Sequence, residues 1–441
     1  MSEGLFARYA WLPDGLARDV RIRVSGGRIE EVTPGAGPQP ADRELAGLTL
    51  PAFANTHSHA FHRALRGRTH GGGGTFWSWR DRMYRLAGQL DPDSYFALAR
   101  ATFAEMALAG VSCVGEFHYL HHRPGGTRYG DPNEMGAAVV RAAADAGIRI
   151  TLLDTCYVAG GLGADGPLPL APEQLRFGDG DADAWAERVA RLHPQPHARI
   201  GAAIHSVRGV PRAQLPVIVA AARGRPLHVH LSEQPDENAQ CLAAYGVTPT
   251  RLLRDAGALG RLTTAVHATH LTAEDIADLG GTGTSVSMCP TTERDLADGI
   301  GPARELKDAG APITLGSDQH AVIDLLEELR GLEMDERLAS LHRGRFRPGE
   351  LIAALTLDGH RSLGWGDAGR IEAGARADLT TLRLDSPRTA GCEPEQAVFA
   401  ATAADVDRVM VDGRVIVEAG RHLLGDVGRL LGEAIEPLWA G

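Results

Sequence analysis

Eight short apolar segments, separated by longer amphipathic ones, follow one another through the middle of the chain. We expect these segments to be β-strands, at residues 48–56, 111–118, 148–156, 199–206, 225–232, 263–269, 284–289 and 312–317. Helical periodicity lies between them, for example at residues 94–109, 133–146, 211–222 and 323–341. Strands that alternate with helices predict a parallel sheet. The pattern is typical of an α/β protein with a (β/α)8 TIM-type barrel, which takes about 250 residues.

The two ends of the chain carry a different pattern, in which apolar and polar residues alternate one by one. Residues 20–24 and 28–32 alternate on either side of a turn at 25–27, which indicates a β-hairpin. Residues 377–382 and 409–417 repeat the pattern, and Asp412-Gly413 is a strong hairpin turn. We therefore expect a small β-sandwich-like module made of residues 1–50 and 370–425, a barrel at 51–369 and a helical tail at 426–441.

Composition and charge exclude several classes of partner. The chain has 441 residues, and 45 Lys and Arg against 56 Asp and Glu give a formal charge of −11. With no basic cluster, this charge argues against binding to nucleic acid or to an anionic membrane. No apolar stretch reaches the length of about 18–20 residues that a membrane span needs. Five scattered cysteines without a CxxC pair, and an N-terminal segment unlike a signal peptide, predict a cytoplasmic protein.

Several predicted strands end in residues that bind metals or transfer protons. His57 and His59 lie two residues apart, so in an extended segment their imidazoles point to the same side. An isolated pair of this kind occurs by chance, but His230 and Asp318 end two further strands. Three imidazoles and one carboxylate suit a borderline divalent ion. We therefore expect one divalent metal ion per chain, most consistent with Zn²⁺.

Two further residues at the strand ends are candidates for proton transfer. Glu233 follows His230 by three residues, which places it above the barrel mouth, where a carboxyl group can move a proton without binding the metal. The alternative is a solvated glutamate at the start of a helix. His267 or His270 can orient and polarise a metal-bound water, and the deeper position of His267 in its strand favours His267. Asp318 can receive the proton of that water. The predicted catalytic residues are therefore Glu233, His267 and Asp318.

Together these residues resemble the amidohydrolase superfamily. The resemblance rests on Pro51-Ala52-Phe53-Ala54-Asn55-Thr56-His57-Ser58-His59, His230, Glu233, His267 and Ser317-Asp318, and it spans nearly the whole chain. No lysine ends the predicted fourth strand, where two-metal members usually carry one, and the chain reads Ala203-Ile204-His205-Ser206-Val207-Arg208 there. The chain is therefore most similar to the single-metal deaminase branch.

Finer motifs resemble the formiminoglutamate deiminases of this superfamily. They are Phe76-Trp77-Ser78-Trp79-Arg80, Glu116-Phe117-His118-Tyr119 and His205-Ser206-Val207-Arg208. The resemblance implies hydrolysis of N-formimino-L-glutamate, a small dicarboxylate of histidine degradation, to N-formyl-L-glutamate and ammonia. It further implies that Arg80 and Arg208 bind substrate carboxylates, while Tyr119 and His205 add hydrogen bonds. His62 stands where the family commonly has glutamine, and it can still form a hydrogen bond. We also expect a homodimer.

Two other functions remain open. One is a related single-metal deaminase or chlorohydrolase that acts on a purine, pterin or triazine, although such planar substrates do not require two arginines. For both arginines, structural ion pairing is the alternative role. The other function is that of a non-catalytic barrel scaffold, which the intact metal-binding and proton-transferring positions argue against.

Overall fold

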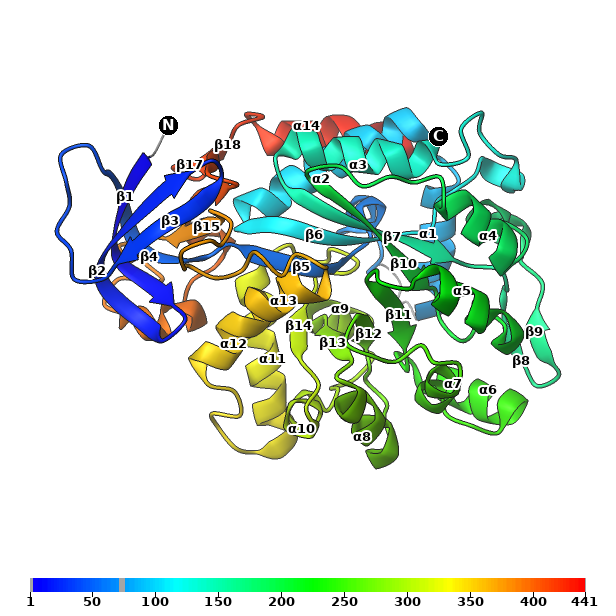
Figure 1. Ribbon diagram of the computed structural model, residues 1–441. Coiled ribbons are helices and arrows are strands. Elements are labelled where there is room, and N and C mark those ends of the chain that lie inside the picture. The colour runs from blue at the N-terminus through cyan, green and yellow to red at the C-terminus, as the bar shows by residue number, and fades with distance from the viewer. Residues whose placement is uncertain (1–2, 71–75, 441) are drawn as a thin grey trace.

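The computed structural model describes residues 3–70 and 76–440, which form a barrel with a separate sheet beside it (Figure 1). The barrel sheet has eight parallel strands in the order β14-β13-β12-β11-β10-β7-β6-β5. They are β5 (Phe53–Ser58), β6 (Val111–His118), β7 (Arg149–Cys156), β10 (Ala198–Ile204), β11 (Leu227–Leu231), β12 (Thr263–His267), β13 (Ser285–Met288) and β14 (Ile313–Leu315). A bridge between Ser58 and Asp318 joins the first strand to the last. The predicted (β/α)8 barrel is therefore confirmed.

Helices surround the barrel strands and cover their outer surface (Figure 1). They are α1 (Phe76–Ala87), α2 (Pro92–Leu108), α3 (Glu134–Ala146), α4 (Ala182–Val189), α5 (Leu215–Ala221), α6 (Pro235–Tyr245), α7 (Pro249–Asp255), α8 (Ala273–Thr282), α9 (Pro290–Asp295), α10 (Ala303–Ala309), α11 (Leu325–Ser340), α12 (Pro348–Leu355) and α13 (Leu357–Ser362). Every residue of β6 and β7 is buried, because side chains of the barrel core lie on one face and helices on the other. Gly147, with a φ of +79°, ends α3 as a left-handed C-terminal cap.

Short segments connect these elements. They are the 3-10 helices η1 (Ala60–Leu65), η2 (Pro124–Gly126), η3 (Pro172–Phe177), η4 (Arg212–Gln214), η5 (Pro394–Phe399) and η6 (Ala403–Asp405), and the hairpin β8 (Gly161–Gly163) and β9 (Gly166–Leu168). At the C-terminal end, α14 (Val427–Ile435) packs against α2 and is followed by η7 (Glu436–Trp439). Within the described ranges, no helix combines the length and the apolar character needed to cross a membrane.

The second sheet is built from both ends of the chain, as the sequence predicts. Its strands are β1 (Glu3–Leu12), β2 (Gly15–Ser25), β3 (Arg28–Thr33), β4 (Arg43–Pro51), β15 (Leu379–Leu382), β16 (Val406–Val411), β17 (Arg414–Glu418) and β18 (Arg421–His422). They run in the order β18-β17-β16-β15-β4-β1-β2-β3, so β4 and β15 join the two ends of the chain. The predicted turn at Asp412-Gly413 is present, with both residues at positive φ. The exact division into domains stays a prediction.

The chain passes from this terminal sheet into the barrel at Ala52. Pro51 still pairs with Leu379 in the terminal sheet, whereas the N–H of Phe53 donates to the carbonyl oxygen of Gly110 at 3.0 Å. The segment expected as one strand at 48–56 is therefore the end of β4 followed by β5. Its apolar residues are continuous because both strands are buried on two sides.

Candidate active site and metal centre

The first and eighth barrel strands meet at their carboxyl ends through His57 and Asp318. The N–H of Asp318 donates to the carbonyl oxygen of His57 at 3.0 Å, and the N–H of His59 donates to the carbonyl oxygen of Asp318 at 3.1 Å. Asp318 Oδ1 also lies 3.2 Å from His57 Nε2 and 3.3 Å from His59 Nε2. Gly316 allows this approach, since a Cβ atom there would lie 2.7 Å from the Cβ of His57. The contact that closes the barrel therefore also gathers three of the predicted metal ligands.

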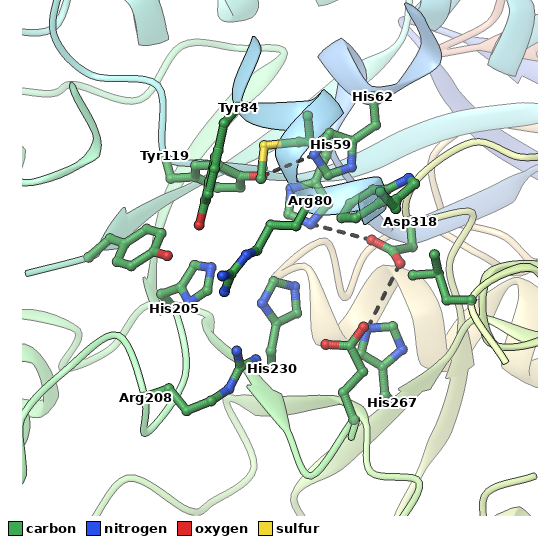
Figure 2. A pocket seen from close by; sticks show the side chains of 15 residues that line it. His59, His62, Arg80, Tyr84, Tyr119, His205, Arg208, His230, His267 and Asp318 are labelled. Carbon is green, nitrogen blue, oxygen red and sulfur yellow. Dashed lines mark hydrogen bonds and ion pairs between the residues drawn. The ribbon is translucent and has the colours of Figure 1, made fainter. Parts of the chain in front are cut away.

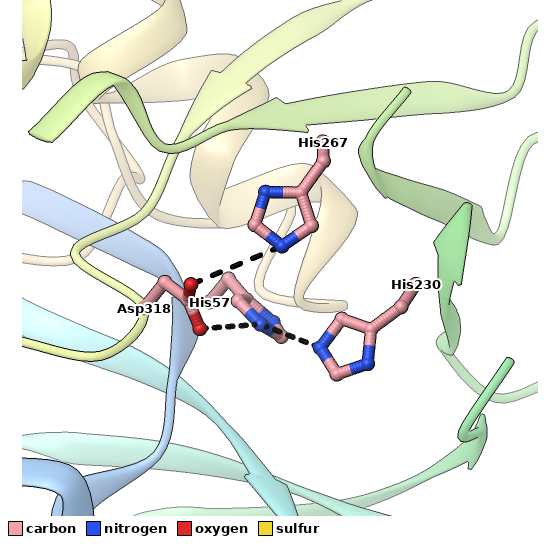
Figure 3. A group of neighbouring side chains, drawn as sticks. All are labelled: His57, His230, His267 and Asp318. Atoms are coloured by element: carbon pink, nitrogen blue, oxygen red, sulfur yellow. Dashed lines mark hydrogen bonds and ion pairs between the residues drawn. The ribbon is translucent and has the colours of Figure 1, made fainter. Parts of the chain in front are cut away.

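Two more histidines reach the same point from neighbouring strands. His230 Nε2, at the end of β11, lies 3.0 Å from His57 Nε2, and His267 Nε2, at the end of β12, lies 3.8 Å from Asp318 Oδ2. The ligand atoms of His57, His230, His267 and Asp318 all lie within 4.8 Å of one another (Figure 3). His59 belongs to an adjoining group with His62 and Asp318. The structure thus places three of the four predicted ligands in one group with His267, while His59 lies beside this group in contact with Asp318.

The protonation of these residues fits a bound cation. Burial lowers the pKa of His57, lowers that of His230 far more, and lowers the pKa of His59 to about 3. These imidazoles are therefore neutral, which is the form that binds a metal. Burial opposes ionisation of Asp318, yet the hydrogen bond from His57 and the nearby imidazoles hold the pKa of this carboxyl far below its usual range. Three neutral imidazoles and one carboxylate therefore suit Zn²⁺.

Outer contacts orient two of the histidines. His59 Nδ1 lies 3.0 Å from the carbonyl oxygen of Phe117, to which it donates, so its Nε2 lone pair faces Asp318. His267 Nδ1 lies 3.4 Å from Glu293 Oε1, and that same oxygen accepts the N–H of Cys289 at 2.8 Å. Burial would lower the pKa of His267, but Glu233, Glu293 and Asp318 raise it to about 10. His267 is therefore the imidazole most able to hold a proton.

Glu233 lies directly beside this group. It follows β11, is 7% exposed, and its Oε1 lies 3.9 Å from His267 Nε2. Burial raises the pKa of Glu233, although the charges of His267 and Arg208 oppose the rise. A carboxyl group whose pKa is raised in this way holds its proton nearer to neutral pH, where it can act as a general acid.

A cavity of about 580 Å³, part of it open to solvent, lies above these residues (Figure 2). Histidines, aromatic residues and two arginines form most of its wall, which consists of His59, His62, Trp79, Arg80, Met83, Tyr84, Tyr119, Tyr157, His205, Arg208, His230, Glu233, His267, Leu296 and Asp318. All five predicted substrate-binding residues therefore line the same cavity as the candidate catalytic residues.

The predicted substrate-binding residues are held in place by their neighbours. His62 Nε2 and Tyr119 Oη are 3.0 Å apart. His205 stacks on Tyr157, with ring centroids 3.9 Å apart. Burial lowers the pKa of both His62 and His205 well below the usual value, so both rings are neutral hydrogen-bonding groups.

The two arginines come from different elements and face the same part of the cavity (Figure 2). Arg80 lies in α1 with its guanidinium 5.6 Å from the centre of the Tyr84 ring. Arg208 follows β10, and its Nε donates to Glu237 Oε2 at 2.9 Å. The cavity therefore has a cationic end at these arginines and an acidic end at Glu233 and Asp318.

Several residues of the site are not predicted from the sequence. Tyr84 and Tyr157 line the cavity, and their hydroxyl oxygens both accept hydrogen bonds from Gln174 Nε2, at 3.0 and 2.9 Å. Tyr157 directly follows β7, so the rule that strand ends carry function could have identified it. Gln174 carries no such signal, because its contacts join segments far apart in the chain. The glycine run at 71–74, between the first and second predicted strands, lies outside the described residues.

The comparisons with known proteins define the class. Residues 48–416 match the amidohydrolase family, and residues 3–46 match the N-terminal domain of formimidoylglutamate deiminase HutF. The chain belongs to the amidohydrolase family. This agrees with the resemblance seen in the sequence and with a barrel whose strand ends carry histidines and an aspartate.

Individual relatives narrow the comparison. Formimidoylglutamate deiminase from Pseudomonas aeruginosa is 36% identical over 437 residues, which cover 95% of this chain and 95% of that protein. The 8-oxoguanine deaminase from Pseudomonas aeruginosa is 32% identical over 417 residues, covering 91% of this chain and 90% of that protein. The crystal structure of an amidohydrolase from Brucella melitensis has a TM-score of 0.92 and 32% identity, covering 99% of this chain and all of the other. The chain is thus a homologue of formimidoylglutamate (formiminoglutamate) deiminase.

Proposed function

We propose that the protein hydrolyses N-formimino-L-glutamate to N-formyl-L-glutamate and ammonia. The observation that carries this proposal is the polarity of the cavity, which has two arginines at one end and Glu233, His267 and Asp318 at the other. A formiminoglutamate molecule has a matching polarity, with a hydrolysable C=N bond at one end, a carboxylate at the other end and a second carboxylate between them. The relative that is 36% identical carries this activity in its name.

Substrate binding follows from the side chains of the cavity. Arg80 and Arg208 offer planar guanidinium groups, which bind carboxylates through paired hydrogen bonds. Tyr119, His205 and His62 supply neutral hydrogen-bonding groups around the chain of the substrate. Holding the two carboxylates fixes the formimino carbon at the acidic end, so binding energy far from the reacting bond is used for positioning.

The chemistry follows from the acidic end. His57, His59, His230 and Asp318 would hold one divalent ion, with His267 beside them. Such an ion, when bound, lowers the pKa of water and polarises the carbon under attack. Asp318 receives the proton that water loses as its oxygen bonds to the formimino carbon and the C=N bond becomes a single bond, while His267 guides the water. Glu233 gives one proton to the terminal nitrogen, and Asp318 passes the proton taken from water to the same nitrogen. The C–N bond then breaks as the hydroxyl group loses its proton to Glu233 and forms the C=O bond, so one ammonia leaves for each water consumed and both carboxyl groups are restored.

Ammonia release from a panel of substrates tests this function. We expect kcat/KM for formiminoglutamate to exceed that for 8-oxoguanine, guanine, adenosine and a triazine by at least about 100-fold, the scale of losing one charged and one neutral hydrogen bond. A preference for 8-oxoguanine would favour the alternative, which the relative at 32% identity represents. If protein loaded with Zn²⁺ turned over none of these compounds, the result would favour the role of a non-catalytic scaffold.

Cellular context and assembly are part of the proposal. All five cysteines lie in the described residues and none is in a disulfide, which agrees with a reducing compartment such as the cytoplasm. We place the reaction in histidine degradation, since that is where the resemblance puts formiminoglutamate. A homodimer stays a prediction, and light scattering coupled to size-exclusion chromatography will measure its mass.

A further inference from the structure

Glu237 lies in the first turn of α6, directly behind the cavity wall, and has no exposed surface. Its Oε2 accepts a hydrogen bond from Nε of Arg208 at 2.9 Å. Its Oε1 accepts the backbone N–H of Ser232 at 2.9 Å. One buried carboxylate therefore joins the loop after β10 to the turn after β11, and so joins the two ends of the cavity.

The first contact fixes the guanidinium of Arg208. The Arg208 side chain is 15% exposed and lines both the main cavity and a second pocket beside the β8–β9 hairpin. Since Glu237 holds the Nε atom, the planar group cannot turn freely, and this hydrogen bond uses Nε rather than a terminal nitrogen. A guanidinium fixed in this way loses little freedom when it binds a carboxylate.

The second contact fixes the turn that carries Glu233. Ser232 has a φ of +49°, a left-handed conformation that is unfavourable for residues other than glycine. The hydrogen bond from its N–H to Glu237 stabilises this conformation. Glu233 is the next residue, and its carboxyl group reaches to 3.9 Å from His267 Nε2. The direction of the Glu233 side chain therefore depends on the turn that Glu237 holds.

Glu237 also keeps two opposite charges apart. Arg208 and Glu233 line the same cavity. Without a carboxylate behind it, the Arg208 guanidinium would gain most by pairing with Glu233. Such a pair would remove both the group that binds substrate and the group that gives the proton. Burying a carboxylate without a role of this kind is unfavourable.

We propose that Glu237 is a positioning residue that holds Arg208 for the substrate carboxylate and Glu233 for proton transfer. This inference rests on the proposed function. It touches neither the substrate nor the metal. Its effect reaches the reaction through two other residues, one of which governs binding and one of which governs turnover. Removing it must therefore change KM and kcat by separate routes.

The test is steady-state kinetics on Glu237→Gln, which keeps the shape of the side chain. The amide has no negative charge and one acceptor oxygen, so its NH2 group faces one of the two donors and neither contact keeps a charged hydrogen bond. We expect KM for formiminoglutamate to rise about 10-fold and kcat to fall about 10-fold, the scale of losing one charged hydrogen bond on each route. The matched control is Asp236→Asn, which removes the same charge from an exposed neighbour in α6 and leaves both constants unchanged.

The variant is then combined with Arg208→Met. If Glu237 acts as proposed, Glu237→Gln causes no further rise in KM in this background, but kcat still falls. A mono-amide analogue that lacks the carboxylate bound by Arg208 will likewise show only the kcat effect. The proposal would be overturned if Glu237→Gln changed kcat and KM equally for every substrate and in both the wild-type and the Arg208→Met background. Values of kcat and KM like those of Asp236→Asn would also overturn it. Wild-type protein without activity on formiminoglutamate would instead refute the proposed function.

If Glu237→Gln turns over too slowly for reliable kinetics, a binding measurement still separates the effect through Arg208 from the effect through Glu233. Calorimetric titration with N-formyl-L-glutamate, the proposed product, reports the Arg208 route alone. We expect Glu237→Gln to bind it about 10-fold more weakly than wild type, with a thermal unfolding midpoint close to that of Asp236→Asn. Wild-type affinity in the variant would exclude the Arg208 route.

Discussion

His57 and His230 face each other across the barrel mouth with their Nε2 atoms 3.0 Å apart. Burial lowers the pKa of both rings, so neither is protonated at neutral pH. Two facing Nε2–H groups would clash, so at least one of the two rings directs an Nε2 lone pair into the gap between them. Asp318 Oδ1 lies 3.2 Å from His57 Nε2. Two neutral imidazoles and an ionised carboxylate arranged in this way supply part of the coordination shell of one divalent ion.

Metal content is therefore the first prediction. Purified protein will hold about one divalent ion per chain, and His230→Ala will reduce the content to near zero because the variant loses one of the converging ligands. His193→Ala, at an exposed histidine, is the control and keeps the full content. Elemental analysis measures both. Activity of the wild type that survives exhaustive chelation would contradict a metal-dependent reaction.

The second prediction concerns Glu233. Glu233→Gln keeps the size of the side chain but removes the proton that the proposed reaction delivers to nitrogen. Since general acid catalysis typically contributes about 10²–10⁴-fold, kcat will fall at least about 100-fold. Metal content will stay normal, because Glu233 is outside the group of converging ligands. Stopped assays of ammonia release measure the rate, and a near-normal kcat would reduce Glu233 to a structural residue.

The sequence predicts the barrel and the strand-end residues because both depend on local pattern. An apolar strand that ends in His57 or His230 carries its own signal, since the side chains alternate and the strand end faces the barrel mouth. The spacing of His57 and His59 is less informative. β5 ends at Ser58, so His59 lies beyond the strand and joins His62 as well as the main group. Which histidines bind the metal is therefore a three-dimensional question.

Contacts that join distant segments are what the sequence does not predict. The continuous apolar segment at 48–56 gives no sign that the chain changes sheets at Ala52, because both strands are buried. Glu237 has the ordinary appearance of an acidic residue in the first turn of a helix. Its burial behind Arg208 and Ser232 depends on how α6 packs beside two strand ends, which no spacing within α6 encodes.

The third prediction concerns the junction between barrel and terminal sheet. Arg149 in β7 pairs with Asp378 just before β15, and both side chains are at most 1% exposed. Asp378→Asn leaves a buried cation with a weaker partner, so stability will fall by up to about 3–5 kcal/mol, the cost of breaking a buried pair. Chemical unfolding followed by circular dichroism measures this loss. Glu433→Gln, which breaks the exposed pair with Arg429, is the control and will cost less than about 1 kcal/mol.

The last prediction concerns the two arginines at the cationic end of the cavity. If each binds a substrate carboxylate, Arg208→Met and Arg80→Met will each lower kcat/KM for formiminoglutamate by about 10–150-fold, or roughly 1.5–3 kcal/mol. Arg212→Met, at an exposed arginine four residues beyond Arg208, is the control and leaves kcat/KM unchanged. Each variant will show its smallest loss of kcat/KM on the amide analogue that lacks the carboxylate bound by the mutated arginine. Two analogues, each with a different carboxylate converted to an amide, therefore show which arginine binds which carboxylate. Unchanged kcat/KM in both variants would contradict carboxylate binding by these arginines and would favour the hypothesis that the substrate is a neutral heterocycle.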